Sequence, residues 1–308
     1  MRIVFFGTPE FAVKPLDAIN RSSHEIVAVV SQPDRVNGRN NKTVFGAVKK
    51  YALEHGLSVL QFENVSAQGG EILRALKPDV MVTCAYGQIL KKNVLDICPI
   101  YNIHASLLPK YRGSSPVQWA LINGESEVGV TIMKTELGVD TGDMLMQKSV
   151  VLNGDENSEE TLALLSDVGA ELIVSVLNQA EKGNLTGIKQ DESRATHCRM
   201  LTKADGKIDF AGSAEQIKNF VRGMTPWPGA FTRGESGVFK VIKAETAEAE
   251  GGTECGEVVV SDPKKGLIVK CGEGYLRLNV IQAENGKAMD AKAYLLGHKI
   301  PEGSVFRG

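Results

Sequence analysis

The pattern of hydrophobic and polar positions divides the chain into two parts. In the first part, short runs of apolar residues alternate with stretches in which apolar residues recur every three or four positions, which is typical of strands followed by helices. Such continuous apolar strands indicate a parallel sheet that is covered on both faces, and the right-handed crossover rule then predicts a Rossmann-like, doubly wound α/β domain. The strands expected are 3–6, 25–31, 57–61, 80–85 and 101–104, and the helices are 10–20, 47–55 and 67–76.

The end of this α/β part is marked by a long amphipathic helix. Residues 128–133 and 144–151 are expected to pair beside strand 101–104. Asn157, with Glu160 three positions later, predicts the start of the helix. One buried stripe follows at helical spacing, made of Leu162, Leu165, Gly169, Leu172, Ile173 and Val176.

The second part of the chain has a different period. Residues 183–207 are polar and rich in glycine, which is typical of a linker, and Ser213 with Gln216 predicts a capping box that opens a helix to Arg222. Short strands with turn signals between them then predict a small OB-like β-barrel. The strands are 238–244, 257–261, 267–271 and 275–282, and the domains expected are 1–187 (α/β, catalytic), 188–207 (linker) and 208–308 (OB-like).

Length and charge agree with two domains and restrict the partners. The 308 residues predict about two domains. The net charge of −2 excludes a wholly basic nucleic-acid coat but allows local basic patches. Residues 196–308 carry 16 basic and 14 acidic side chains, and residues 35–50 carry five basic side chains and no acidic one. We interpret residues 34–43, which are polar, as an open loop.

The cysteines and the apolar runs bear on the compartment. Five cysteines form no C-x-x-C pair, so a disulfide framework or a zinc site is disfavoured and a reducing cytoplasm is favoured. The apolar run near the N-terminus is too short for a signal peptide, and no stretch approaches the 18 apolar residues of a transmembrane helix. The turn at Gly7 has one glycine where a dinucleotide fingerprint needs three, so NAD binding is disfavoured.

The most informative stretch for chemistry is the strand that ends in Asn102, Ile103 and His104. Residues two apart on a strand project to the same face, and His104 lies at the carboxyl end, where open α/β sheets place their sites. An amide and an imidazole side by side can donate to a developing oxyanion or relay a proton. The alternative interpretation is a hydrogen-bonded core histidine, which the adjoining asparagine and the Leu-Leu-Pro loop disfavour.

A second candidate is the carboxylate of Asp140, which Gly138 and Gly142 bracket in a tight loop. A carboxylate beside an imidazole favours the protonated ring and can take part in proton transfer. A surface Asx-turn is the alternative interpretation. Together with the Asn-x-His strand, the loop indicates an acid–base site.

The chain contains the motifs FGTPEFA, SQPDR, AYGQIL, NIHASLLPKYRGSSPVQWA, GVTIMKTELGVDTGDML and TPWPGA. These motifs resemble the methionyl-tRNA formyltransferase family over nearly the whole chain. The resemblance implies transfer of the formyl group of 10-formyltetrahydrofolate to the amine of initiator methionyl-tRNA. It implies that Asn102, His104 and Asp140 are catalytic, that Ser106, Leu107, Leu108 and Pro109 bind the folate, and that backbone around Gln88, Ile89 and Leu90 meets the pterin ring.

One loop departs from the family pattern. After QPDR the family has a lysine-rich, GRGKK-like run, whereas this chain has Gly38-Arg39-Asn40-Asn41-Lys42. Arg39 and Lys42 are the tRNA contacts that the resemblance implies in this less basic loop. We expect a cytoplasmic monomer with no metal and no membrane partner.

The reaction that the resemblance implies is acyl transfer between two nitrogens. It requires an oxyanion donor, a proton path and accurate placement of the amine. We expect Asn102 and His104 to donate to the oxyanion, and either His104 or a water bound to Asp140 to take the amine proton. The apolar Leu-Leu-Pro loop would limit hydrolysis by water. The alternatives are a formyltetrahydrofolate hydrolase, a nucleotide-sugar formyltransferase and a non-catalytic tRNA-binding module.

Overall fold

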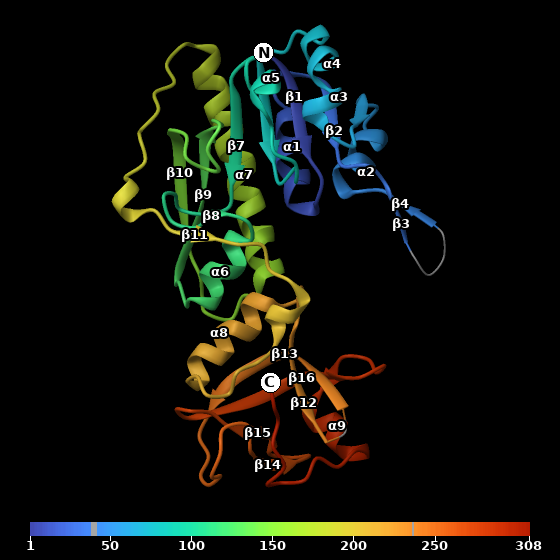
Figure 1. Ribbon diagram of the computed structural model, residues 1–308, viewed down its shortest axis with the longest axis vertical. Helices are drawn as coiled ribbons and strands as arrows, with labels where there is room; N and C mark the ends of the chain where they lie inside the picture. Colours follow the sequence, from blue (N-terminus) through green and yellow to red (C-terminus); the bar gives the residue numbers. More distant parts are fainter. Residues whose placement is uncertain (38–41, 236) are drawn as a thin grey trace. The chain divides into compact units, whose positions relative to one another are not determined.

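The computed structural model describes residues 1–37, 42–235 and 237–308 of the chain. The chain divides into two compact units (Figure 1). The first unit comprises residues 1–113, 127–150 and 162–198, and the second comprises 114–126, 151–161 and 199–308. Each unit therefore takes segments from several places in the chain, and each is described by itself.

The first unit is built on a seven-stranded sheet with the strand order β10-β9-β7-β6-β1-β2-β5 (Figure 1). The five strands from β5 to β7 are parallel, and β9 runs antiparallel to β7. Numbered along the chain, the parallel strands have the order 3-2-1-4-5, so the predicted Rossmann-like fold is confirmed. The bounds are β1 Arg2–Gly7, β2 Glu25–Ser31, β5 Val59–Gln61, β6 Val80–Cys84, β7 Ile100–His104, β9 Glu127–Lys134 and β10 Met144–Val151.

The central strand β1 shows why this sequence forms a covered parallel sheet. Its residues Ile3–Phe6 are fully buried, as a strand with helices on both faces requires. The strand order reverses between β1 and β6, and open α/β sheets bind their ligands beside the carboxyl ends of the strands at such a point. The helices of this unit are η1 Glu10–Ala12, α1 Val13–Asn20, α2 Ala47–Glu54, α3 Val65–Gln68, α4 Gly70–Ala75, α5 Lys92–Leu95, most of α7 Ser158–Glu181 and η2 Glu192–Arg194.

Two local predictions need correction. The expected helix 67–76 is divided at Gly69 and Gly70 into α3 and α4. The expected open loop 34–43 is wrong in its described part, because β3 (Arg35–Asn37) pairs antiparallel with β4 (Lys42–Val44). The β-branched residues in these two short segments favour extended backbone, and the polar composition concealed the pairing.

The long helix α7 begins as predicted. The amide N–H groups of Glu159 and Glu160 donate to Asn157 Oδ1, and the N–H of Asn157 donates to Glu160 Oε2. Gly169 and Leu172 of the predicted stripe are buried, whereas Leu162 is only half-buried. The capping residues therefore determine where α7 starts, and burial of its apolar face determines its orientation on the sheet.

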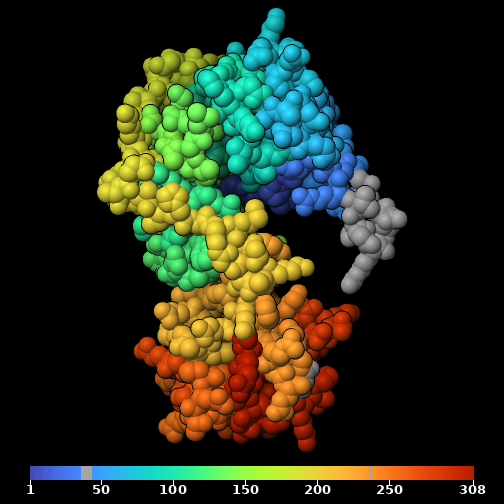
Figure 2. Space-filling view, viewed as in Figure 1, coloured from blue at the N-terminus to red at the C-terminus, as the bar shows by residue number. Residues whose placement is uncertain are grey.

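The segment after α7 packs on the first unit up to Cys198. The backbone groups of Ile188 and Met144 pair by two hydrogen bonds of 2.8 Å. β11 (His197–Cys198) forms a parallel pair with β8 (Arg112–Gly113). Figure 2 shows residues of this segment in yellow at the surface. These contacts join the segment to β10 and to the loop that follows β7, although its composition is typical of a linker.

The second unit contains an antiparallel sheet with the order β12-β13-β16-β15-β14, to which β17 adds beside β16. Residues near the C-terminus complete it: Arg307 pairs with Arg233 of β12, and Val305 pairs with Glu257 next to β14. The predicted antiparallel β-domain is confirmed, and this segment bridges its two edge strands. The bounds are β12 Ala230–Gly234, β13 Gly237–Ala247, β14 Val258–Asp262, β15 Gly266–Lys270, β16 Tyr275–Ala283 and β17 Met289–Asp290.

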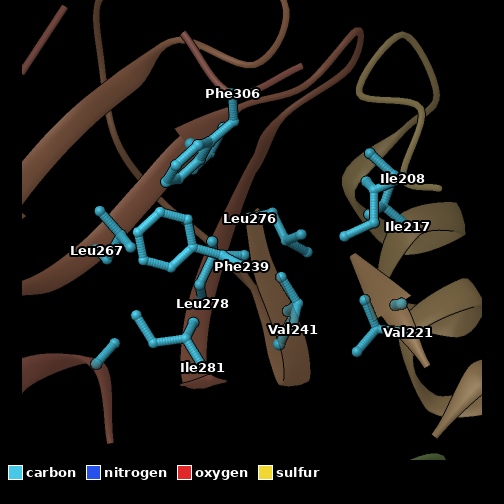
Figure 3. Close-up of a cluster of buried hydrophobic side chains, with 14 of the residues drawn as sticks. Ile208, Ile217, Val221, Phe239, Val241, Leu267, Leu276, Leu278, Ile281 and Phe306 are labelled. Atoms are coloured by element: carbon cyan, nitrogen blue, oxygen red, sulfur yellow. The ribbon is translucent and has the colours of Figure 1, made fainter. Parts of the chain in front are cut away.

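The core of the second unit is apolar (Figure 3). Phe239 of β13 lies between Leu267, Leu278 and Phe306 in this view, and all four side chains are buried. Burial of these side chains is the main source of this unit's stability. The helices of the unit are α6 Pro116–Ile122, η3 Lys203–Gly206, α8 Ala214–Met224 and α9 Ala291–Gly297.

The helix α6 shows that the second unit is not confined to the C-terminal part of the chain. It lies against α8, where a Cβ on Gly223 would meet Ile122 Cγ1 at 2.7 Å and the Gln118 carbonyl oxygen at 2.9 Å. Trp119 and Ile122 of α6 pack on the apolar core of the unit.

Among the helices of the described residues, we find none with the length and apolar character needed to cross a membrane.

Candidate active site

The strand β7 carries the first two candidate residues at its carboxyl end. Asn102 is half-buried, and its Oδ1 accepts a hydrogen bond of 2.9 Å from the Thr83 hydroxyl on the neighbouring strand β6. The register of the sheet places Thr83 directly beside Asn102. Because the amide oxygen is held in this way, the Nδ2 group is directed away from Thr83, and we find no partner for it among the described residues.

His104 makes contacts on both sides of its ring. Its Nε2 lies 2.9 Å from the Tyr111 carbonyl oxygen, and its Nδ1 lies 3.6 Å from Asp140 Oδ2. A carbonyl oxygen can only accept, so Nε2 carries a hydrogen and donates it. Nδ1 is therefore the ring atom that is able to take up or give a proton, and it faces a carboxylate.

Asp140 reaches His104 from the loop between β9 and β10. Its Oδ2 accepts a hydrogen bond of 2.8 Å from the Gly113 N–H, and its backbone has a φ of 53°. A positive φ is uncommon outside glycine, and it indicates that the surrounding structure holds this residue in place. The loop passes so close to β9 that a Cβ at Gly142 would lie 1.8 Å from the Lys134 carbonyl oxygen. Asn102, His104 and Asp140 are thus brought to the same end of the sheet.

A buried arginine, which sequence analysis did not identify, lies next to this pair. Arg112 is only 1% exposed, and its Nη1 and Nη2 donate to the two carboxylate oxygens of Glu192 at 2.9 and 2.7 Å. This pairing raises the pKa of Arg112 and lowers the pKa of Glu192. Arg112 Nε also donates to Gln190 Oε1, at 3.0 Å. The arginine stands in the YRG motif, whereas nothing local in the sequence indicates its partners.

The folate segment that the resemblance implies forms a compact loop after β7. Ser106, Leu108 and Pro109 are buried, and Leu107 is half-buried. The Ser106 hydroxyl donates to the Lys110 carbonyl oxygen at 2.7 Å, so this hydroxyl is already used within the loop. Loop shape and the apolar side chain of Leu107 are therefore what this segment can offer to a ligand.

The segment Gln88–Leu90 follows β6, the strand next to β7. The Gln88 side chain links this segment to the backbone of residues 62–65. Its Oε1 accepts from the Val65 N–H, and its Nε2 donates to the Phe62 carbonyl oxygen. Ile89 is 76% exposed, although it is apolar. Within the described parts of the chain, the backbone groups of Gln88 and Leu90 make no hydrogen bond. Open backbone groups beside an exposed apolar side chain fit a flat, polar-edged ring such as a pterin.

The two expected tRNA contacts differ in what the structure describes. Arg39 lies outside the described residues, and Lys42 is the first residue of β4. The base of this hairpin is fixed by Lys49, whose Nζ donates to Asp34 Oδ2 at 2.5 Å and to Gln61 Oε1 at 2.8 Å. This hydrogen bonding lowers the pKa of Asp34.

The arrangement supports proton transfer and stabilisation of negative charge. Asn102 offers a fixed amide donor, and His104 offers Nδ1 beside the Asp140 carboxylate. Such groups act most strongly where they are already fixed before the reaction, because no reorganisation is then required. In the parts of the chain that the structure describes, no group of three or more His, Cys, Asp or Glu side chains could hold a metal ion.

Comparison with known proteins gives concordant results. A family model described as formyl transferase matches residues 1–177, and one described as formyl transferase, C-terminal domain, matches residues 200–299. The methionyl-tRNA formyltransferase of Caldanaerobacter subterraneus subsp. tengcongensis is 44% identical over 313 residues, which covers 100% of both chains.

Two solved structures share the fold at low identity. The methionyl-tRNA formyltransferase from Clostridium thermocellum matches with a TM-score of 0.57 and 16% identity over 81% of this chain and 95% of that chain. HypX from Aquifex aeolicus in complex with tetrahydrofolic acid matches with a TM-score of 0.64 and 16% identity over 96% of this chain. The match covers 47% of HypX, so this chain spans about half of that protein.

Proposed function

Because the chain belongs to the methionyl-tRNA formyltransferase family, we propose that Asn102, His104 and Asp140 carry out its formyl transfer. The chain is an enzyme that moves the formyl group of 10-formyltetrahydrofolate to the amine of initiator methionyl-tRNA. The observation that supports these three residues is their meeting at the carboxyl end of β7, with His104 Nδ1 3.6 Å from Asp140 Oδ2.

The folate supplies an activated formyl group, and the residues of the chain supply charge stabilisation and a proton path. Asn102 donates from Nδ2 to the oxygen of the formyl group as that oxygen becomes negative, because Thr83 occupies its amide oxygen. Removing one such donor typically costs about 100-fold or more in turnover.

His104 acts through Nδ1, because its Nε2 hydrogen is donated to the Tyr111 carbonyl. The neutral ring accepts the proton of the attacking amine at Nδ1, directly or through a water on Asp140. The protonated ring then gives this proton from Nδ1 to the folate nitrogen as the bond between that nitrogen and the formyl carbon breaks. Until then the Asp140 carboxylate stabilises the positive charge of the ring. Both proton routes expected from the sequence, the direct one and the one through a water on Asp140, therefore end at Nδ1 of His104.

The loops after β6 and β7 would hold the folate. The open backbone groups of Gln88 and Leu90 and the exposed side chain of Ile89 would contact the pterin. The loop Ser106–Pro109 would lie beside it and limit the access of water to the formyl group. Both contacts rest on the family resemblance together with these features.

The tRNA would be held at two basic surfaces. Arg39 and Lys42 belong to the basic stretch 35–50 of the sequence, and further basic side chains are spread over residues 196–308. Contacts to phosphates give a salt-dependent affinity, with a slope of about 0.7–0.9 in log affinity against log salt for each neutralised phosphate. Arg39→Ala should therefore weaken tRNA use and leave folate binding intact.

The setting of the enzyme is also part of the proposal. We place it in the cytoplasm as a monomer, in agreement with five free cysteines in the described residues. The catalytic domain would span 1–187, the linker 188–207 and the OB-like, tRNA-binding domain 208–308. These bounds follow chain order, whereas the compact units exchange short segments.

The test of this function offers one formyl donor to several acceptors. The full-length chain is incubated with 10-formyltetrahydrofolate and charged initiator tRNA, uncharged tRNA, an amino sugar nucleotide, or buffer alone, and the loss of the donor is followed. We expect rapid loss only with charged initiator tRNA. Equal loss in buffer would indicate a hydrolase, loss with the sugar would indicate a sugar formyltransferase, and no loss with any acceptor would indicate a binding module.

A further inference from the structure

The segment Ile188–Cys198 contains polar side chains that lie against both loops of the candidate active site. Its composition is typical of a linker, and the catalytic scheme above uses none of its residues. Gln190 and Glu192 nevertheless bind buried or strained parts of the site. These contacts are the subject of our further inference, which rests on the proposed function.

Gln190 spans the bend that carries Asp140. Its Nε2 donates to the carbonyl oxygens of Asp140 and Gly142, each at 2.8 Å. An amide nitrogen has two hydrogens, so both are used on this one loop. Asp140 has a positive φ of 53°, a conformation that persists only where neighbouring groups hold it. Gln190 supplies this restraint from outside the loop.

Arg112 determines which way the Gln190 amide faces. The guanidinium has five N–H donors and no acceptor, so the group that it meets must be the amide oxygen. Nε of Arg112 lies 3.0 Å from Gln190 Oε1, and the two terminal nitrogens are held by Glu192. The two amide hydrogens of Gln190 are thereby directed to the loop of Asp140.

The backbone around Arg112 contacts both catalytic side chains. The Tyr111 carbonyl accepts from His104 Nε2, and the Gly113 N–H donates to Asp140 Oδ2. The backbone on either side of Arg112 thus binds the catalytic pair directly, and the Arg112 side chain binds Gln190. The geometry of His104 and Asp140 therefore depends on where the segment Ile188–Cys198 holds Arg112.

We propose that Gln190, oriented by the Arg112–Glu192 pair, is a positioning residue that holds the Asp140 carboxylate at His104 Nδ1. Gln190 touches neither catalytic side-chain group, and it acts through the backbone of the Asp140 loop. Its removal would leave the reacting groups present and displace one of them. A displacement of about 1 Å can lower the rate about 100-fold, so we expect the removal of Gln190 to lower kcat rather than to raise KM.

Two variants of the full chain test this role. Gln190→Glu keeps the size and the acceptor for Arg112 but removes both donors, and Gln190→Met removes all polar contacts at similar length. We expect kcat to fall about ten-fold or more in both, while KM for the folate and for charged tRNA changes less than about three-fold. The control is Asp191→Asn, because the Asp191 carboxylate accepts from Ser193 at the surface and its substitute retains an acceptor.

A double-mutant cycle separates positioning from a general loss of structure. If Gln190 acts through Asp140, Gln190→Met should slow an Asp140→Asn enzyme by less than about two-fold. Equal slowing in both backgrounds, or full kcat in Gln190→Met, would overturn this inference alone. Full kcat in Asp140→Asn would instead overturn the role of Asp140 in the proposed function, and this inference with it.

Discussion

Two regions of the molecule are stabilised by different interactions. One is the active-site corner of the first unit, formed around His104, Arg112 and Asp140, and the other is the barrel of the second unit, formed by strands β12–β17 with the C-terminal segment that bridges the edge strands. In the corner, polar side chains are withdrawn from solvent and held by hydrogen bonds: His104 with Tyr111, Arg112 with Glu192, and Asp140 with Gly113. In the barrel, apolar side chains of neighbouring strands pack on one another (Figure 3). Hydrogen bonds fix direction and distance, whereas apolar burial contributes free energy with little directional demand. The hydrogen bonds of the corner therefore fix the positions of its polar groups, whereas apolar burial in the barrel contributes mainly to the stability of the second unit.

The largest effect is expected in the barrel. Phe239 is 2% exposed and contacts the rings of Tyr294 and Phe306, so Phe239→Ala should destabilise the second unit by about 3–5 kcal/mol. Both tryptophans of the chain, Trp119 and Trp227, lie in this unit, so tryptophan fluorescence in a urea titration reports its unfolding.

The control for this variant is Leu296→Ala, a truncation at a side chain that is 78% exposed. It should change the free energy of unfolding by less than about 0.5 kcal/mol. Equal urea midpoints for Phe239→Ala and the control would show that burial does not dominate in the barrel.

In the corner, loss of a catalytic group should change rate rather than stability. His104→Ala should lower turnover by about 100-fold or more, because the group that accepts the amine proton and returns it to the leaving folate nitrogen is lost. The urea midpoint should change little, since the truncation opens no large apolar cavity. The exposed His55, changed to Ala, is the matched control, and a similar turnover in the two variants would contradict the assignment.

A smaller effect, on both rate and stability, is expected where the corner's backbone is crowded. Gly113 has a φ of 105°, and a Cβ there would lie 2.3 Å from the Cys198 carbonyl oxygen. Gly113→Ala should destabilise the first unit by about 1–3 kcal/mol and slow turnover, because the N–H that binds Asp140 would move.

Gly183→Ala isolates the effect of backbone conformation in this comparison. Gly183 also has a positive φ, of 71°, but no atom of the residues that the structure describes lies within 4 Å of an added Cβ. We expect that variant to lose some stability, measured by circular dichroism during urea unfolding, and to keep full turnover. A slow Gly183→Ala enzyme would mean that crowding at Cys198 is not the cause.

The smallest effect concerns the pH dependence of the Arg112–Glu192 pair. The hydrogen bond from Arg112 holds the pKa of Glu192 below its ordinary value of 4.5. The charged pair is therefore fully formed above pH 4.5, and its contribution is lost as the pH falls through the lower pKa of the folded chain. Glu192→Gln should make the stability of the first unit less dependent on pH below 4.5. An unchanged pH profile of the thermal midpoint would contradict a role of this pair in stability.

Local patterns in the sequence were sufficient for much of the fold. The buried run Ile3–Phe6, the cap at Asn157 and the capping box at Ser213 each depend on neighbours within a few positions. Such features are readable because burial and capping repeat with the period of the strand or helix. The Asn-x-His pair on β7 and the glycines around Asp140 belong to the same class, and with them the motifs of the family.

The tertiary structure decided which distant residues meet. Gln190 joins the loop of Asp140, Arg112 pairs with Glu192 eighty positions away, and Arg307 completes the sheet beside Arg233. These contacts are single polar or backbone pairings between separate segments, and no periodicity marks either partner in advance. The buried guanidinium of Arg112 needs a carboxylate, and the strained loop of Asp140 needs hydrogen-bond donors. The segments that supply these partners come close only when the chain is folded. The sequence by itself therefore determined the elements and the chemical groups, whereas the packing of segment Ile188–Cys198 on β8 decided how those groups are held.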